Sequence, residues 1–117
     1  MNATEMIAGA RACLAEKGMA KHTLQDGSGR VCLYGALWKT TRDTCQWPEF
    51  QNERYTAATL RIYKAITEQY PERPVIPRTT LEAVAISTNI SFNNDPETTP
   101  EMLDAVLAKA ELMEEDL

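Results

Sequence analysis

The chain contains 117 residues, of which 44% are hydrophobic and 25% are charged. This composition is typical of one globular domain over residues 1–117, and it argues against a disordered chain. No apolar run approaches the roughly 20 residues that cross a bilayer, and the N-terminus lacks the basic and apolar regions of a secretion signal. We therefore expect a cytoplasmic protein that has no membrane partner.

The formal net charge of −5 is distributed unevenly along the chain. From Asp95 onward, eight acidic residues accompany a single base, Lys109, so this segment carries −7 and the preceding residues carry +2. Such a segment would attract a basic partner, although a merely solvated helix face gives the same pattern. Acidic residues at a helix C-terminus oppose the helix dipole, so we expect residues 111–117 to fray.

Composition also disfavours nucleic-acid binding and a disulfide framework. The isoelectric point is near 4.9, and one predicted helix carries too few bases to form a nucleic-acid surface, namely Arg54, Arg61 and Lys64. The chain has three cysteines, an odd number, whereas disulfide frameworks normally use an even number. Free thiols in a reducing compartment fit this count best.

A first helix is predicted over residues 3–17. Asn2 is a suitable cap, and Glu5 stands where a reciprocal capping partner belongs. Gly18 suits the reversal of the chain after the last turn. Apolar residues at helical spacing, Leu14 among them, give this helix one buried face.

Residues 21–33 predict a small β-hairpin. The turn-forming sequence Asp26–Gly29 separates two short runs of mixed apolar character, which is the usual pattern of a hairpin. Two short strands are marginally stable in water, so the hairpin would have to pack against helices. A short second helix follows over residues 32–41, in which Gly35 would allow close contact with another helix.

The rest of the chain predicts a loop over residues 42–52 and three further helices. The first covers residues 53–70, the second begins at Thr79 after a proline-rich connector, and the third is capped by Thr99 with Pro100 in its first position. The whole sequence therefore predicts a mainly α fold, a compact bundle of about five helices with a small β-hairpin. Its shared core would contain Leu14, Ile66, Val84 and Leu107.

Two sequence blocks resemble those of a family of small proteins of unknown function from actinobacteria and their phages. The first is Gly29–Leu37, which follows the turn, and the second is Phe92–Thr99, which opens the closing helix. The family has a tryptophan where this chain has Phe92. The resemblance implies a helical fold and the cytoplasm of an actinobacterium, or of the host if the protein is phage-encoded. It implies no catalytic activity.

Cys32 and His22 are the candidate catalytic residues. A thiol at the start of a helix and near Arg30 would be favoured as thiolate, and a Cys–His pair is the minimum for thiol nucleophilic catalysis. The alternative is that Cys32 packs into the core as a small hydrophobic residue, which is common for free cysteine. We expect no metal site, since no close pair of ligands organises the cysteines and the histidine, and no cofactor.

Other residues are candidates for binding. The turn Asn93–Asp95 offers two amides and a carboxylate to a ligand, but such side chains often only satisfy loop backbone groups. Trp38 and Trp47 would suit a protein interface; the alternative is that both simply cover the core.

Three functions remain open from the sequence, and the lack of a convergent polar set argues against an enzyme. The leading hypothesis is a protein-interaction or accessory protein, phage-encoded and acting on a host protein of unknown identity. The second is a small thiol-dependent enzyme or ligand-binding module that uses Cys32 and His22. The third is a homo-oligomer joined through Trp38 or Trp47.

Overall fold

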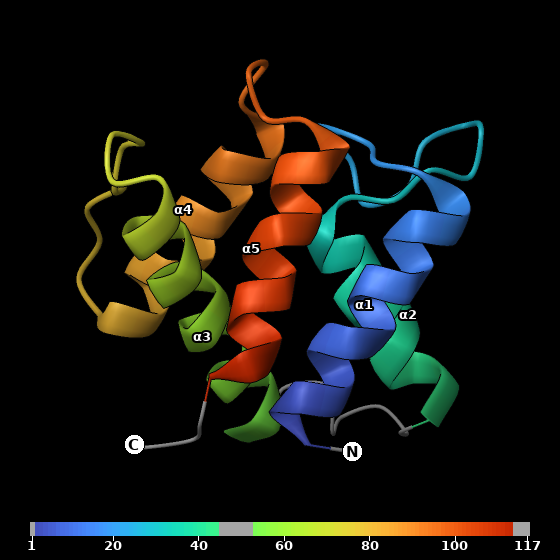
Figure 1. The fold of residues 1–117 in the computed structure, drawn as a ribbon, viewed down its shortest axis with the longest axis horizontal. Helices are drawn as coiled ribbons and strands as arrows, with labels where there is room; N and C mark the ends of the chain where they lie inside the picture. Colours follow the sequence, from blue (N-terminus) through green and yellow to red (C-terminus); the bar gives the residue numbers. More distant parts are fainter. Residues whose placement is uncertain (1, 45–52, 114–117) are drawn as a thin grey trace.

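The computed structural model describes residues 2–44 and 53–113, and these form five helices (Figure 1). Helix α5 lies between α1 and α3, while α2 packs against α1 and α4 packs against α3. The Cα radius of gyration is 13.0 Å, a value that indicates compact packing for a chain of this length. The predicted compact, mainly α fold is therefore confirmed. The helices are α1 (Ala3–Lys17), α2 (Leu33–Thr44), α3 (Glu53–Gln69), α4 (Leu81–Asn94) and α5 (Pro100–Leu112).

Local capping chemistry sets where α1 begins and ends. Asn2 Oδ1 accepts a hydrogen bond from Glu5 N at 2.8 Å, and Glu5 Oε1 accepts one from Asn2 N at 3.0 Å. This is the reciprocal cap that the sequence predicts. Gly18 follows with φ of +90°, a backbone angle that residues with a Cβ rarely adopt. The predicted bounds of α1 are confirmed.

The other helix bounds differ slightly from prediction. Helix α2 begins at Leu33, and Cys32 stands outside it as the preceding residue; the helix continues to Thr44, beyond the predicted end at residue 41. Thr80, and not Thr79, caps α4, because its hydroxyl accepts from Ala83 N at 3.2 Å. The remainder of the predicted loop, residues 45–52, lies outside the described residues.

The aliphatic faces of the helices meet in one core. Ile66 and Leu107 are 1% and 0% exposed, whereas Leu14 and Val84 are half-buried at its edge. Burying aliphatic surface of this kind is the main driving force for the helix assembly. The largest fully buried apolar side chains are Ile7, Val31, Leu33, Leu37, Ile62, Ile66, Leu103, Val106 and Leu107.

The predicted β-hairpin is wrong. Between residues 18 and 32 the structure has only isolated bridges, in which Val31 pairs in parallel with Met19 and antiparallel with Gln25. The chain does reverse at Asp26, whose carboxylate accepts from the backbone N–H groups of Ser28 and Arg30. However, backbone groups on the approach to this turn bond to side chains of α4, so no ladder of strand hydrogen bonds forms there.

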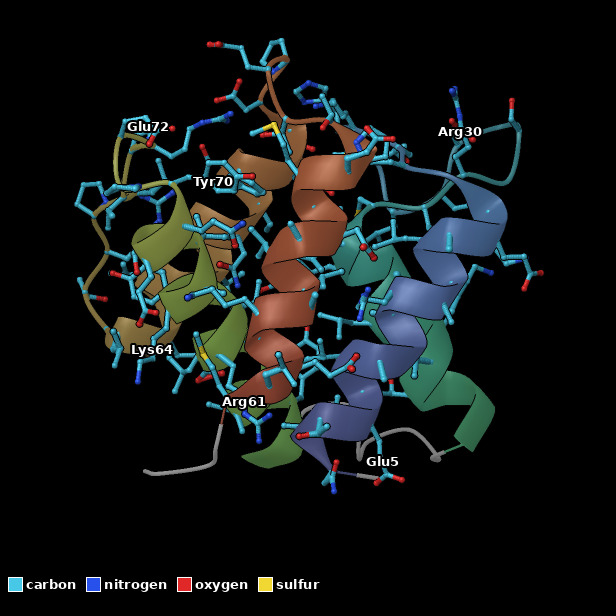
Figure 2. The ribbon with its side chains drawn as sticks, in the orientation of Figure 1. Glu5, Arg30, Arg61, Lys64, Tyr70 and Glu72 are labelled. Atoms are coloured by element: carbon cyan, nitrogen blue, oxygen red, sulfur yellow. The ribbon has the colours of Figure 1, made fainter. Side chains whose placement is uncertain are left out.

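Two long side chains of α3 differ in their surroundings (Figure 2). Arg61 is only 7% exposed, and its Nη1 donates to Thr4 Oγ1 on α1 at 2.8 Å. Lys64, one turn later, is exposed. Because the Arg61 side chain is buried and links α3 to α1, it does not contribute to a basic patch on the surface of α3.

None of the helices within residues 2–44 and 53–113 combines the length and the apolar character that crossing a membrane requires.

Candidate functional site

Asn93 joins three segments near the end of α4. Its side chain is buried, with 2% of the residue exposed. Asn93 Nδ2 donates to Ala20 O at 3.0 Å and to Asn94 Oδ1 at 3.1 Å, while Asn93 Oδ1 accepts from Leu33 N at 3.1 Å. Leu33 N is one of the helix N–H groups that has no partner within the helix. Asn93 therefore caps α2 from another helix and holds the α1–α2 loop in place.

Asn94 fixes the backbone at His22. Its Oδ1 accepts from His22 N at 2.8 Å. His22 has φ of +65°, the positive value that residues other than glycine rarely adopt. The hydrogen bond that His22 N donates to Asn94 helps to offset a backbone strain of about 1–2 kcal/mol. His22 is thus presented at the surface by an anchored, strained turn.

Asn93 and Asn94 lie within α4 and not in the predicted turn, whereas Asp95 caps the end of this helix and serves a separate contact. Its carboxylate lies 2.8 Å from Arg73 Nη1, and it also accepts from Glu97 N at 2.9 Å. The Arg73 guanidinium stacks over the rings of Tyr70 and Phe92, at 5.9 Å and 5.3 Å from their centroids. These contacts stabilise the connection between α4 and α5, the α4–α5 corner, so the Asp95 carboxylate has a structural role.

Lys21 attaches the α1–α2 loop to the same corner. Its ammonium donates to the backbone oxygens of Asp95 and Thr98, the latter at 2.8 Å. Burial lowers the pKa of Lys21, and the nearby Asp95 carboxylate opposes that change. The anchor is therefore a cation inserted between carbonyl groups, which stiffens the loop on its α4–α5 side.

A cavity of about 310 Å³ lies beside this anchored loop. It brings together residues from two predicted sites, the pair Cys32 and His22 and the asparagines Asn93 and Asn94. Leu24 and Ile90 also line it, and both are exposed, at 57% and 43%. The remaining lining residues are Thr23, Leu33 and Tyr34. A mostly apolar cavity with a few fixed polar groups is typical of a binding site.

A buried polar network supports the wall of this cavity. Tyr34 Oη lies 3.3 Å from Thr59 Oγ1 and accepts from Asn89 Nδ2 at 3.0 Å. Asn89, fully buried on α4, also donates to Thr59 O at 3.1 Å. Burial raises the pKa of Tyr34, so its hydroxyl remains protonated. The network ties together α2, α3 and α4, which gives the cavity a rigid wall.

Cys32 is half-buried in the cavity, so it belongs neither to the deep core nor to the open surface. Its Sγ accepts from Gly35 N at 3.3 Å, as the cap of the first turn of α2. Among the contacts of the described residues, no hydrogen bond joins Cys32 to His22. Arg30 pairs with Asp26 at 2.7 Å instead of with the sulfur. The cavity thus holds a thiol that caps α2 and an imidazole to which this thiol is not hydrogen-bonded.

The remaining predicted candidates lie elsewhere. Trp38 is half-buried on α2 and does not line this cavity. Trp47 and Cys45 lie outside the described residues. Within the part of the chain that is described, no three His, Cys, Asp or Glu side chains gather as a metal site would require.

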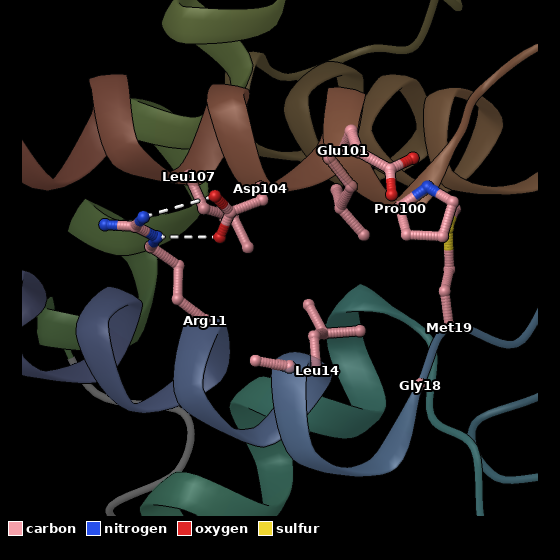
Figure 3. A pocket seen from close by; sticks show the side chains of 10 residues that line it. Arg11, Leu14, Gly18, Met19, Pro100, Glu101, Asp104 and Leu107 are labelled. Carbon is pink, nitrogen blue, oxygen red and sulfur yellow. Dashed lines mark hydrogen bonds and ion pairs between the residues drawn. The ribbon is translucent and has the colours of Figure 1, made fainter.

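A second cavity, of about 460 Å³, lies between α1 and α5 (Figure 3). Arg11 of α1 faces Asp104 of α5, with Nε–Oδ1 and Nη2–Oδ2 distances of 2.9 and 3.2 Å. Glu111 lies 3.7 Å from the same guanidinium. Sequence reasoning did not find this site, because the two walls are 93 residues apart. The only feature of the sequence that pointed toward this cavity was the acidic character of the last helix.

The comparisons with known proteins give one result. A model of DUF6197, a family of unknown function, matches residues 1–112. The chain belongs to this family. No curated protein and no solved structure matches the chain.

In this DUF6197 protein, the two blocks that carried the resemblance meet in space. The first block contributes Cys32 and Leu33, and the second contributes Asn93 and Asn94. The Asn93–Leu33 hydrogen bond is the direct connection between them. Since the family brings no activity with it, inference about function rests on the two cavities.

Proposed function

We propose that this DUF6197 protein is a non-enzymatic interaction module that holds an apolar side chain of a protein partner in the cavity beside His22. The observation that carries the proposal is that two exposed aliphatic residues, Leu24 and Ile90, line a cavity whose loop is anchored. Exposed large aliphatic residues beside a concave, rigid surface are characteristic of binding sites. Because the loop is already fixed by Asn93 and Asn94, little conformational entropy would be lost on binding.

The setting of this proposal follows from the family resemblance of the sequence blocks. We propose that the protein acts in the cytoplasm of an actinobacterial cell, where a phage-encoded copy would bind a host protein. The acidic segment from Asp95 onward supports a partner that carries basic residues near its apolar anchor, because the charges would attract each other before contact.

A selection from a random peptide library tests the proposal. We expect displayed peptides of about 12 residues that bind the wild-type protein to share an apolar anchor. The double variant Leu24→Asp and Ile90→Asp should bind them at least about tenfold more weakly, because it places carboxylates where an apolar side chain would be buried. Isothermal titration calorimetry with the enriched peptides gives the affinities.

The matched control is Leu112→Asp, which makes the same change at a position that is 84% exposed and lies outside the cavity. This variant should bind the selected peptides as the wild type does. Recovery of no peptide family, or equal loss of affinity in the control, would count against the cavity as the contact site.

A thiol-dependent function is the second candidate, because the Cys32 sulfur and the His22 imidazole line the same cavity. Catalysis of this kind needs the base within hydrogen-bond distance of the thiol, and that contact is missing here. The interaction module is therefore the better supported proposal.

Alkylation kinetics separate the two candidates. In a background of Cys13→Ser and Cys45→Ser, iodoacetamide should modify Cys32 no faster than it modifies free cysteine, because the sulfur is half-buried. His22→Ala should change this rate by less than about twofold, since no hydrogen bond links the two side chains. A rate about tenfold above free cysteine that falls with His22→Ala would instead favour the thiol-dependent enzyme.

A further inference from the structure

The larger cavity, between α1 and α5, has an apolar floor. Leu103 and Leu107 of α5 are almost fully buried beneath it, and Leu14 of α1 is half-buried on the opposite wall. Met19 and Pro100 close one end (Figure 3). Aliphatic stems of long side chains can pack on such a floor.

The rim of this groove carries excess negative charge. Glu101 is exposed and has no hydrogen bond or ion pair among the described residues. Asp104 and Glu111 share one cation, Arg11. The hydrogen bonds that Arg11 donates to Asp104 raise the pKa of Arg11, so this guanidinium remains charged. Of these carboxylates, only Glu101 and Asp104 line the groove together with Arg11, so its lining carries a net charge of −1.

We propose that the α1–α5 groove is a docking site for a basic amphipathic helix of a protein partner. A lysine or arginine of that helix would lay its stem on the half-buried side chains of Leu14 and Met19 and place its charge beside Glu101 and Asp104. The apolar floor and the acidic rim of the groove together suit a basic amphipathic helix, because such a helix presents an apolar stripe bordered by cations. The −7 charge of the segment from residue 95 onward would accelerate the encounter.

A second copy of this chain is a poorer occupant. The chain carries −5 overall, so two copies would approach against like-charge repulsion. The groove is also separate from the cavity beside His22, because the two share no lining residue. The proposal therefore does not depend on the function proposed for that cavity.

Designed peptides are suitable probes for this groove. Three amphipathic helical peptides of about 14 residues would share one apolar face and carry lysine, glutamine or glutamate on the polar face. Isothermal titration calorimetry at about 50 mM and about 300 mM salt measures binding to the full chain. We expect the lysine peptide to bind most tightly, the glutamate peptide at least about tenfold more weakly, and the difference to shrink at high salt.

Two single-charge variants locate the contact. Glu101→Gln should weaken the lysine peptide about two- to fivefold, the range of one exposed ion pair. Glu97→Gln removes the same charge from an exposed residue that does not line the groove, so it should change affinity by less than about 1.5-fold. Both positions are exposed, and circular dichroism should confirm that both variants fold.

The variant Leu24→Asp with Ile90→Asp keeps the groove intact and should bind the lysine peptide normally. Loss of binding in this variant would place the peptide in the other cavity and overturn the proposal. No binding of the lysine peptide, or equal weakening by Glu97→Gln and Glu101→Gln, would also overturn it. So would self-association of the wild type, seen by light scattering and abolished by Glu101→Gln.

Discussion

Replacement of Asn93 by alanine should lower the free energy of unfolding by about 2–5 kcal/mol. The amide bonds to Leu33 N and Ala20 O, and both of these residues are buried, at 0% and 4% exposure. Without Asn93, neither backbone group would have a side-chain partner, and water would not reach them easily. Each unsatisfied buried group costs about 1–3 kcal/mol. Urea denaturation followed by circular dichroism measures the change.

Asn94→Ala is the matched control for Asn93→Ala. Asn94 is half-buried, and its main partner is the backbone N–H of His22, which is exposed. Water can replace that hydrogen bond, so the loss should be about 1 kcal/mol. Equal losses in the two variants would show that Asn93 does not hold α2 and the α1–α2 loop together as its hydrogen bonds indicate.

Replacement of Gly35 by alanine should destabilise the protein by about 2–4 kcal/mol and displace the loop around Leu24. A Cβ at this position would overlap the carbonyl oxygen of Leu24. That atom belongs to the backbone and accepts from Cys32 N at 3.2 Å, so it cannot rotate away as a flexible side chain would. Alanine normally stabilises a helix relative to glycine, which makes a loss of stability here diagnostic of the close contact.

Gly27→Ala provides the comparison for this prediction. A Cβ at Gly27 would meet no atom within 4 Å, so urea denaturation should show a change within about 0.5 kcal/mol. We also expect Gly35→Ala, but not Gly27→Ala, to weaken peptides that bind beside Leu24. A Gly35→Ala variant as stable as the wild type would mean that the loop relaxes at little cost.

The sequence predicted the helices well because their signals are local. The α1 cap depends on Asn2 and Glu5, three residues apart, and the start of α5 depends on Thr99 and Pro100. Apolar spacing along each helix likewise identified the buried faces that contain Ile66 and Leu107. Such contacts involve neighbours along the chain, so the printed sequence contains them almost completely.

The sequence correctly identified Gly35 as a site of close packing, but the contact that it predicted was wrong. The sequence predicted close contact with another helix, whereas the structure places the Leu24 backbone against it. A true helix–helix approach occurs at Gly9, where a Cβ would meet the Thr40 side chain of α2. Both glycines permit close packing, and only the arrangement of α1, α2 and their loop decides what packs against each.

The hairpin prediction failed for a related reason. Asp26–Gly29 does turn the chain, but the backbone groups of Ala20, His22 and Leu33 bond to asparagine side chains of α4 that lie 60 to 73 residues away. A sequence pattern shows that these groups need partners, and it does not show where the partners come from. Asparagine side chains of α4 therefore form hydrogen bonds with backbone groups that the predicted hairpin would have paired with a neighbouring strand.

The sequence by itself determined the helices, the caps at the start of α1 and α5, the turn at Asp26 and the individual residues that are chemically notable. Only the tertiary structure decided that His22, Cys32, Asn93 and Asn94 line one cavity while Asp95 serves the α4–α5 corner. It alone placed Arg11 of α1 against Asp104 of α5. The physical reason is that capping and periodicity are short-range interactions along the chain, whereas a cavity exists only after segments that are distant in sequence have packed together.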